Sequence, residues 1–547
     1  MTLPQPAAAT ITIDPSFTVG PVRRRTFGAF VEHLGRCVYT GIFEPDHPDA
    51  DEDGFRRDVL ELTRELGVST VRYPGGNFVS GYRWEDGVGP VDRRPVRLDL
   101  AWHSTDPNTV GVDEFAKWSA KAGVEPMMAV NLGTRGTQEA LDLLEYCNID
   151  GGTALSEQRR ANGAEDGYGI KMWCLGNEMD GPWQIGHKNA LEYGRLAADT
   201  ARGMRMIDPD LELVACGSSG PTMPTFGEWE RVVLSETYDL VDLVSAHQYF
   251  EDFGDLQEHL AAGHKMEAFI RDIVSHIDHV KSVKKSTKQV NISFDEWNVW
   301  HMSRDESRVP TGKDWPVAPV LLEDTYTVAD AVVVGDLLVT LLRNTDRVHS
   351  ASLAQLVNVI APIMTEPGGR AWKQTTFHPF ALTSRHASGT VLRLAVESPL
   401  VSGGKTADVA ALSAVATFDA DKAEAVVFAV NRSAAEALTL DAAVAGLGNV
   451  RVVEAVTYAN KDPYWQASAD DSTSVLPSDN GTVKAEGGRL TAELPAVSWS
   501  MIRLAVTGCT ALRGAAAVPV TTAARRWEDG RHGTAHHGGP RSGQVVE

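Results

Sequence analysis

Residues 171–180 read KMWCLGNEMD, a short apolar run followed by a glycine and then by polar residues. The run 172–175 is too short for a helix and is typical of a parallel strand that is buried on both faces. Gly176 ends the run, and Asn177 and Glu178 follow at the point where such a strand leaves its sheet. Residues 290–298, VNISFDEWN, repeat this pattern and end with Asp295, Glu296, Trp297 and Asn298.

The same order of strand, polar exit and amphipathic helix recurs along the first two thirds of the chain. Strands are expected to end at or near Glu32, Asn77, Asn131, Glu178, Ser218, Tyr249, Glu296 and Gln355. Helical patterns lie between them, among them 54–66, 112–122, 189–207, 265–281 and 324–343, the last being the longest. Eight such alternations predict an α/β fold, a (β/α)₈ TIM barrel with insertions. A doubly wound open sheet is the alternative, but no Gly-rich phosphate fingerprint follows an early strand.

The sequence pattern changes after about residue 385, where short alternating strands replace the helical patterns. They are expected at residues 391–397, 425–431, 450–458, 489–494 and 498–506, which predicts a C-terminal β-sandwich. Residues 9–13 also alternate and could complete this sandwich. The predicted domains are residues 1–19 (a strand joining the sandwich), 20–385 (the catalytic barrel), 386–506 (the sandwich) and 507–547 (a disordered tail). His532, His536 and His537 could bind a metal, but a solvated low-complexity tail is the preferred interpretation.

Composition excludes several classes of partner. The formal net charge of -22 argues against nucleic acid or an anionic membrane as a partner. The N-terminus lacks the pattern of a signal peptide, and no apolar run reaches membrane-spanning length. The five cysteines are scattered without metal-ligand spacing and are expected to be reduced, which fits a cytoplasmic location; they are Cys37, Cys147, Cys174, Cys216 and Cys509.

Polar residues at the strand exits are the candidates for chemistry, because barrel active sites are built there. They form no metal-ligand cluster, and one histidine among eight exits, His247, is weak support for zinc. No Gly-x-Ser-x-Gly elbow is present, so a Ser-His-Asp hydrolase is also disfavoured. We therefore expect no metal and no cofactor. The whole set is Glu32, Arg72, Asn77, Asn177, Glu178, His247, Tyr249, Asp295, Glu296 and Gln355.

Two carboxylates at the ends of two buried strands are what glycosidic bond hydrolysis needs, so Glu178 and Glu296 are the predicted pair. A single glutamate after a strand is more often a helix-cap neighbour or a salt-bridge partner. Two of them, each flanked by Asn and Trp, favour a sugar site. Tryptophans in exit segments could stack on a sugar, although each alone is more often core or rim; they are Trp102, Trp183, Trp297 and Trp300.

Five stretches carry a specific resemblance: residues 28–35 (GAFVEHLG), 72–77 (RYPGGN), 175–178 (LGNE), 295–298 (DEWN) and 354–358 (AQLVN). Together they resemble the α-L-arabinofuranosidases of glycoside hydrolase family 51, over residues 9 to 506. The resemblance implies a retaining enzyme with Glu178 as acid/base and Glu296 as nucleophile. It also implies an N-terminal strand that joins the sandwich, and a homo-oligomer, commonly a hexamer. The implied substrate-binding residues are Glu32, Arg72, Asn77, Asn177, Tyr249, Trp300 and Gln355, with Arg72 and Tyr249 orienting the ionised nucleophile.

The leading hypothesis is thus an intracellular, exo-acting α-L-arabinofuranosidase that acts on arabino-oligosaccharides or arabinoxylan fragments. For a retaining mechanism the two carboxyls should lie roughly 5 to 5.5 Å apart and their pKa values should separate. A β-xylosidase or an endoglucanase with the same glutamate pair is the alternative within the class. A non-catalytic sugar-binding barrel is the alternative outside it. The linkage preference, the parent polysaccharide and the order of the oligomer are left open.

Overall fold

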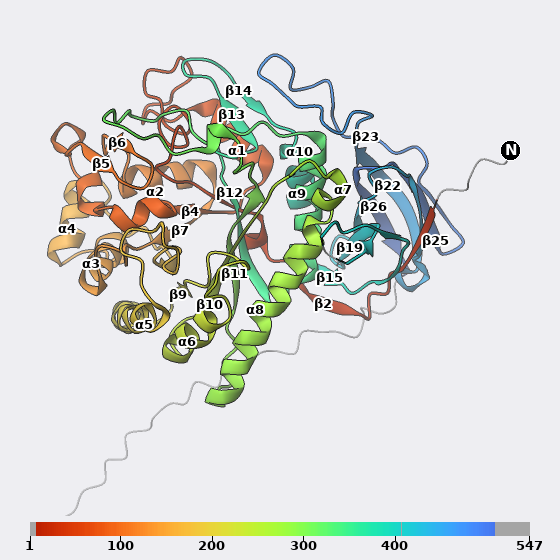
Figure 1. Ribbon diagram of the computed structural model, residues 1–547, viewed down its shortest axis with the longest axis horizontal. Coiled ribbons are helices and arrows are strands. Elements are labelled where there is room, and N and C mark those ends of the chain that lie inside the picture. The colour runs from red at the N-terminus through yellow and green to blue at the C-terminus, as the bar shows by residue number, and fades with distance from the viewer. Residues whose placement is uncertain (1–6, 406, 509–547) are drawn as a thin grey trace, which may run out of the picture. The chain divides into compact units, whose positions relative to one another are not determined.

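The structure, a computed structural model, describes residues 7–405 and 407–508 (Figure 1). Its centre is a closed barrel of eight strands in which every neighbouring pair is parallel. The barrel prediction is confirmed and the open-sheet alternative is wrong. In barrel order the strands are β3 (Gly28–Phe30), β4 (Thr70–Tyr73), β7 (Glu125–Ala129), β8 (Met172–Leu175), β9 (Glu212–Ala215), β10 (Leu243–Phe250), β11 (Asn291–Val299) and β12 (Val348–Ala354).

All five predicted helices are present around the barrel. The helix predicted at residues 324–343 begins later than predicted, and it is not the longest helix of the described chain. α9 begins only at Val328, because the Thr327 side chain accepts a hydrogen bond from the Asp330 amide and caps the helix there. The longest helix is instead α8, with 23 residues. The helices are α1 (Arg57–Leu66), α2 (Val112–Ala122), α3 (Thr137–Asn148), α4 (Ala154–Ala161), α5 (Ala190–Ile207), α6 (Glu228–Thr237), α7 (Leu256–His259), α8 (Ala262–Lys284), α9 (Val328–Arg343) and α10 (Phe377–His386).

Two sheets form the sandwich, and both N-terminal strands belong to them. β1 (Ala7–Thr12) pairs with β16 and β21, and β2 (Thr18–Pro21) pairs with β15. The seven-stranded sheet runs β2, β15 (Thr390–Leu392), β19 (Leu412–Asp419), β20 (Glu424–Asn431), β26 (Ser498–Thr507), β22 (Asn449–Tyr458) and β23 (Ser478–Asp479). The five-stranded sheet runs β16 (Ala395–Glu397), β1, β21 (Leu438–Ala443), β25 (Arg489–Leu494) and β24 (Lys484–Glu486).

One strand prediction in this region is wrong. Residues 391–397 do not form a single strand, since β15 and β16 belong to different sheets and the chain crosses between them at Arg393 and Leu394. Smaller elements complete the fold: β5 (Arg97–Asp99) with β6 (Ser104–Asp106), β13 (Ile363–Thr365) with β14 (Ala371–Lys373), and β17 (Leu400–Val401) with β18 (Val409–Ala410). Single 3₁₀ turns are η1 (Arg24–Phe27), η2 (Asn77–Gly81), η3 (Trp84–Gly87), η4 (Val91–Arg93), η5 (Asp305–Ser307) and η6 (Ala445–Leu447).

Helix α9 joins the barrel to the sandwich. It is buried from Val328 through Leu342, as expected for a helix that is apolar on all sides. Its Gly335 lets the Trp499 ring of β26 approach, since a Cβ there would lie 2.3 Å from the ring. Its Asp336 forms a buried two-pronged ion pair with Arg432, which follows β20. Apolar packing and one satisfied charge pair therefore fasten the two folds together.

The predictions for the cysteines, the tail and membrane-spanning segments can be compared with the described residues. Four cysteines, Cys37, Cys147, Cys174 and Cys216, are buried and unbridged, whereas Cys509 lies outside the described residues. The predicted tail also lies outside them from residue 509 onward, including its three histidines, and Thr507 is still part of β26. Among the described helices, none combines the length and apolarity that crossing a bilayer would require.

Candidate active site

Glu178 follows the carboxyl end of β8, and Glu296 lies in the carboxyl-terminal half of β11. Gly176 (φ 93°) and Glu178 (φ 45°) both adopt left-handed backbone conformations in the turn after β8. That conformation is unfavourable for a glutamate and is typical of residues held for function. Glu296 lies within β11, where the pairing with β12 shifts register between Phe294 and Trp297. Such bulges re-aim side chains near active sites.

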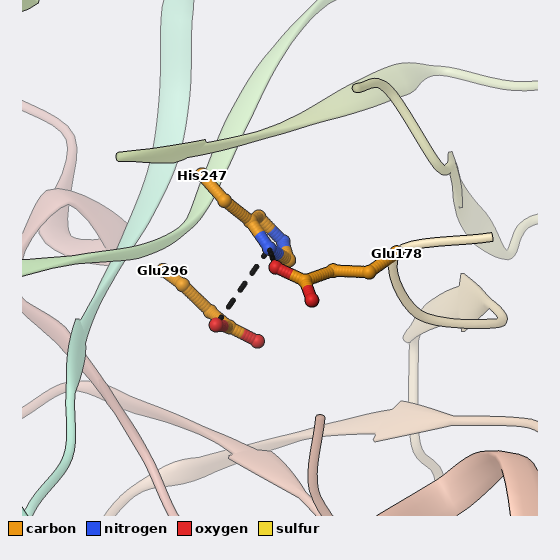
Figure 2. A group of neighbouring side chains, drawn as sticks. All are labelled: Glu178, His247 and Glu296. Carbon is orange, nitrogen blue, oxygen red and sulfur yellow. Dashed lines mark hydrogen bonds and ion pairs between the residues drawn. The ribbon is translucent and has the colours of Figure 1, made fainter. Parts of the chain in front are cut away.

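His247 lies between the two carboxylates, as Figure 2 shows. It is the direct cross-strand neighbour of Glu296, because β10 and β11 pair in that register after a bulge. Its Nδ1 is 2.9 Å from Glu178 Oε1 and 3.6 Å from Glu296 Oε2. One ligand atom from each of the three side chains lies within 4.8 Å of the other two. From its sequence position His247 is only a weak zinc-ligand candidate, and the contact with both glutamates is not predicted, although its place at a strand exit is a signal for it.

Glu296 is surrounded by donors. Arg72 Nη1 donates to its Oε1 at 2.7 Å, and the Tyr249 hydroxyl donates to its Oε2 at 2.7 Å. Burial by itself would raise the pKa of this carboxyl, but the positive charges of His247 and Arg72 and the two hydrogen bonds lower it below its ordinary value. Glu296 is thus held as a carboxylate, which is the form a nucleophile needs.

Glu178 experiences the opposite balance. Burial raises its pKa, and the negative charge of Glu296 raises it further, against hydrogen bonds from His247 and Trp183. Trp183 Nε1 donates to Glu178 Oε2 at 2.8 Å, while 54% of the residue stays exposed. Its ring folds over Gly181, where a Cβ would lie 2.6 Å from the indole. The two carboxyls therefore have pKa values shifted in opposite directions, the arrangement that separates an acid from a base.

The other predicted site residues form a connected network around the pair. Arg72 Nη2 donates to Asn177 Oδ1 at 2.5 Å, and Asn177 Nδ2 donates to Asn77 at 3.4 Å. Trp300 meets the Tyr249 ring edge-on, with centroids 5.1 Å apart. These contacts tie three of the predicted residues, Asn177, Asn77 and Trp300, to the two side chains that hold Glu296.

Glu32 and Gln355 form a second, adjacent group. Gln355 Nε2 donates to Glu32 at 3.2 Å, and Glu32 also accepts from the Phe78 amide and the Trp102 indole. Burial raises the pKa of Glu32 to about 8. Gln355 Oε1 is buried without a hydrogen-bond partner in the described chain. It is therefore free to accept a hydrogen bond from a ligand hydroxyl.

The glycines of the RYPGGN stretch explain how the two groups come together. A Cβ on Gly75 would lie 2.4 Å from the Glu32 side chain, and one on Gly76 would lie 3.0 Å from Glu296 Oε1. The backbone therefore passes between the two carboxylates at a distance that only glycine allows. All nine predicted site residues thus lie in one continuous site.

The side chains of Glu178, His247 and Glu296 also carry atoms that could bind a metal ion. Glu178 Oε1, both oxygens of Glu296 and His247 Nδ1 already have protein partners, whereas His247 Nε2 has none among the described residues. Another acidic group, at residues 51–53, already binds a protein cation, because Lys121 Nζ contacts all three carboxylates. The hydrogen bonds at Glu178 and Glu296 favour acid–base and nucleophilic chemistry by the carboxylates themselves.

A parallel barrel with two glutamates at its carboxyl end, one with a raised and one with a lowered pKa, is the arrangement of a glycoside hydrolase. Comparison with known proteins agrees. Residues 62–260 match the family described as Alpha-L-arabinofuranosidase 1 domain, and residues 295–498 match the Alpha-L-arabinofuranosidase C-terminal domain. The chain belongs to the α-L-arabinofuranosidases of glycoside hydrolase family 51.

Similar proteins cover almost the entire described chain. An intracellular exo-α-(1→5)-L-arabinofuranosidase of Streptomyces lividans is 57% identical over 500 residues, covering 91% of this chain and 75% of the relative. An exo-α-(1→6)-L-arabinofuranosidase of Bifidobacterium longum is 55% identical, covering 90% of this chain and 97% of the relative. A solved family 51 α-L-arabinofuranosidase from Bifidobacterium longum superposes with a TM-score of 0.88 at 48% identity, covering 91% of this chain and 100% of that one.

Proposed function

We propose that this protein is an intracellular exo-acting α-L-arabinofuranosidase that releases terminal arabinofuranose from arabino-oligosaccharides or arabinoxylan fragments with retention of configuration. The observation that carries the proposal is the pair of the half-buried Glu178 and the buried Glu296 on either side of His247, with oppositely shifted pKa values. The names of the relatives support the exo activity and the intracellular location.

In the first step, Glu296 attacks the anomeric carbon as a carboxylate. Glu178 donates its proton to the glycosidic oxygen as the bond to the leaving sugar breaks, and an ester forms between the sugar and Glu296. The exposed indole of Trp183, hydrogen-bonded to Glu178, offers an apolar face to the leaving sugar. Arg72 and Tyr249 orient the attacking carboxylate through their two hydrogen bonds.

In the second step, water replaces the leaving sugar and the ester is hydrolysed. Esterification removes the charge of Glu296, so the pKa of Glu178 falls and this group can accept a proton from water. The separation of the ligand atoms, within 4.8 Å, supports retention, because inverting enzymes keep their carboxyls roughly 6.5 to 9.5 Å apart.

The remaining site residues are proposed to bind the furanose ring. The unpartnered Oε1 of Gln355 is suited to accept a sugar hydroxyl, and Glu32 beside it can accept another. Asn177 and Asn77 would bind further hydroxyls, and Trp300 would line the pocket next to Tyr249. A site made of carboxylates, amides and aromatic rings suits a neutral sugar.

A substrate panel tests the proposed activity. We expect hydrolysis of an aryl α-L-arabinofuranoside, release of single arabinose units from arabino-oligosaccharides, and a first-formed product that keeps its anomeric configuration by NMR. The 1→2, 1→3, 1→5 and 1→6 linkages should be compared, because the two relatives differ in linkage by name. Faster turnover of an aryl β-xyloside or of soluble β-glucan would favour the alternative activities, and binding without any product would favour a non-catalytic barrel.

The pH dependence of kcat/KM follows from the two shifted groups. Activity should fall at low pH as Glu296, with its lowered pKa, is protonated, and at high pH as Glu178, with its raised pKa, loses its proton. The positive charge of His247, whose pKa is raised by Glu296 and Glu178 against the effect of burial, favours the ionised form of both carboxyls. His247→Asn keeps a hydrogen-bonding amide but removes this charge. Both limbs of the profile should then move up by about one pH unit.

A matched control for this experiment is His279→Asn, at an exposed position of α8. Its profile should overlay that of the wild type. Unmoved limbs in His247→Asn would contradict the role given to His247.

We also propose a homo-oligomer, a hexamer by resemblance to the family. Size-exclusion chromatography with light scattering measures the mass of the assembly directly. A monomeric mass near the 59.1 kDa of one chain would contradict it.

A further inference from the structure

A groove begins beside the proposed sugar pocket and runs away from it. Its first part, with a volume of about 340 Å³, starts at Asn77 and is lined by Tyr82, Leu98, Leu100, Asn108 and Ile185 among others. A second cavity of about 530 Å³ continues it and shares Arg83, Asp86 and Thr134 with the first. Volumes in this range are those of small-molecule sites.

The groove adjoins the segment that carries the proposed acid/base. Ile185 comes from the segment after β8 that also carries Glu178, the group proposed to protonate the leaving oxygen. Asn77, at the other wall, is hydrogen-bonded to Asn177, the residue immediately before Glu178. The same two segments are joined again by Gln184, which donates to the hydroxyl of Ser80 and to the Asn177 carbonyl. The two segments around the acid/base thus also line this groove, so a sugar chain beyond Glu178 can extend into it.

The lining suits a sugar. Leu98 and Leu100 are 56% and 62% exposed at the groove, so they offer apolar surface to the apolar face of a ring. The lining also contains the half-buried Asn77 and the exposed Thr134. Their polar side chains are suited to meet sugar hydroxyl groups.

The charges of the walls are largely paired. Arg97 binds Asp86 at 2.9 Å, and Arg135 binds Glu85 at 2.5 Å. Because these ion pairs compensate one another, the walls favour a neutral ligand over an ionic one.

We propose that this groove binds the second and third sugar units on the leaving-group side of a neutral pentose oligosaccharide. The proposal rests on the proposed arabinofuranosidase activity and adds a preference for chain length. Binding energy from these remote units would be used in the transition state, so longer substrates should react faster and not merely bind more tightly.

The test compares kcat/KM for α-linked arabinobiose, arabinotriose and arabinotetraose with that for an aryl α-L-arabinofuranoside. For the wild type, we expect kcat/KM to rise by roughly tenfold in total from the disaccharide to the tetrasaccharide. The aryl glycoside reports the chemistry of the pocket alone. Its complete failure to react would overturn the proposed function, whereas equal kcat/KM for all three oligosaccharides would overturn only the groove.

Two variants locate the effect. The double variant Leu98→Ser, Leu100→Ser removes exposed apolar surface, and Thr134→Val removes an exposed hydroxyl of the lining. In both, the ratio of tetrasaccharide to disaccharide kcat/KM should fall toward one. Leu191→Ser is the matched control, since Leu191 is 41% exposed on α5 outside the groove, and its ratio should equal that of the wild type. A full wild-type ratio in both groove variants would overturn the placement of the site.

Discussion

Glu296→Gln should lower kcat/KM for an aryl α-L-arabinofuranoside by on the order of 10⁴-fold or more. The amide keeps the shape of the side chain, its oxygen can still accept from Arg72, and its NH2 group can donate to the Tyr249 hydroxyl, so the site should stay folded. It cannot form the ester with the sugar, and it removes the charge that holds the proton on Glu178. Initial rates together with circular dichroism would separate loss of chemistry from loss of fold.

The neighbouring carboxylate provides a matched control for Glu296. Asp295 is also buried and lies 3.9 Å from Arg72, but its oxygens contact Ser293 and Cys174. Asp295→Asn should therefore cause a clearly smaller loss than Glu296→Gln. Equal losses would contradict the assignment, as would a slow fluorinated arabinofuranosyl substrate that labels a residue other than Glu296 in mass spectrometry.

Glu178→Ala should slow the hydrolysis of sugar leaving groups by roughly 10²- to 10⁴-fold, the usual contribution of a general acid. An aryl group that leaves without protonation should be released at a much less reduced rate in the first step. The ester on Glu296 should then accumulate, because no group remains to activate water. A burst of aryl alcohol followed by slow turnover would report this accumulation.

Azide distinguishes the roles of the two glutamates. In Glu178→Ala, azide should restore turnover by attacking the ester and yield a glycosyl azide of retained configuration, because two displacements have occurred. In Glu296→Ala, direct attack by azide would give the inverted product. An inverted azide from Glu178→Ala would contradict the double displacement.

Much of the fold could be predicted because its signals are local. The run Met172–Leu175 is β8, and Gly176 ends it as expected. Strand exits carry the same polar residues that the structure gathers at the carboxyl end of the barrel, since closure brings all eight exits to one rim. The candidates Glu178, Glu296 and Arg72 followed from position alone.

The predictions of element boundaries were wrong where the same local pattern is compatible with two different structures. Residues 391–397 alternate like one strand, but β15 and β16 pair with different partners, and only the packed sheets reveal the break. The start of α9 depends on the Thr327 cap, a single side chain inside a longer apolar pattern. Periodicity cannot resolve features of this size.

The sequence alone determined the class of fold, the order of the strands and the chemical types at each exit, because burial periodicity and turn residues act over a few neighbours. Only the tertiary structure decided which exits touch. Bulges in β10 and β11 set His247 opposite Glu296, and the turn after β8 brings Glu178 to the same imidazole. The opposite pKa shifts follow from these distances, because Coulomb energy and desolvation depend on positions in space and not on separation along the chain.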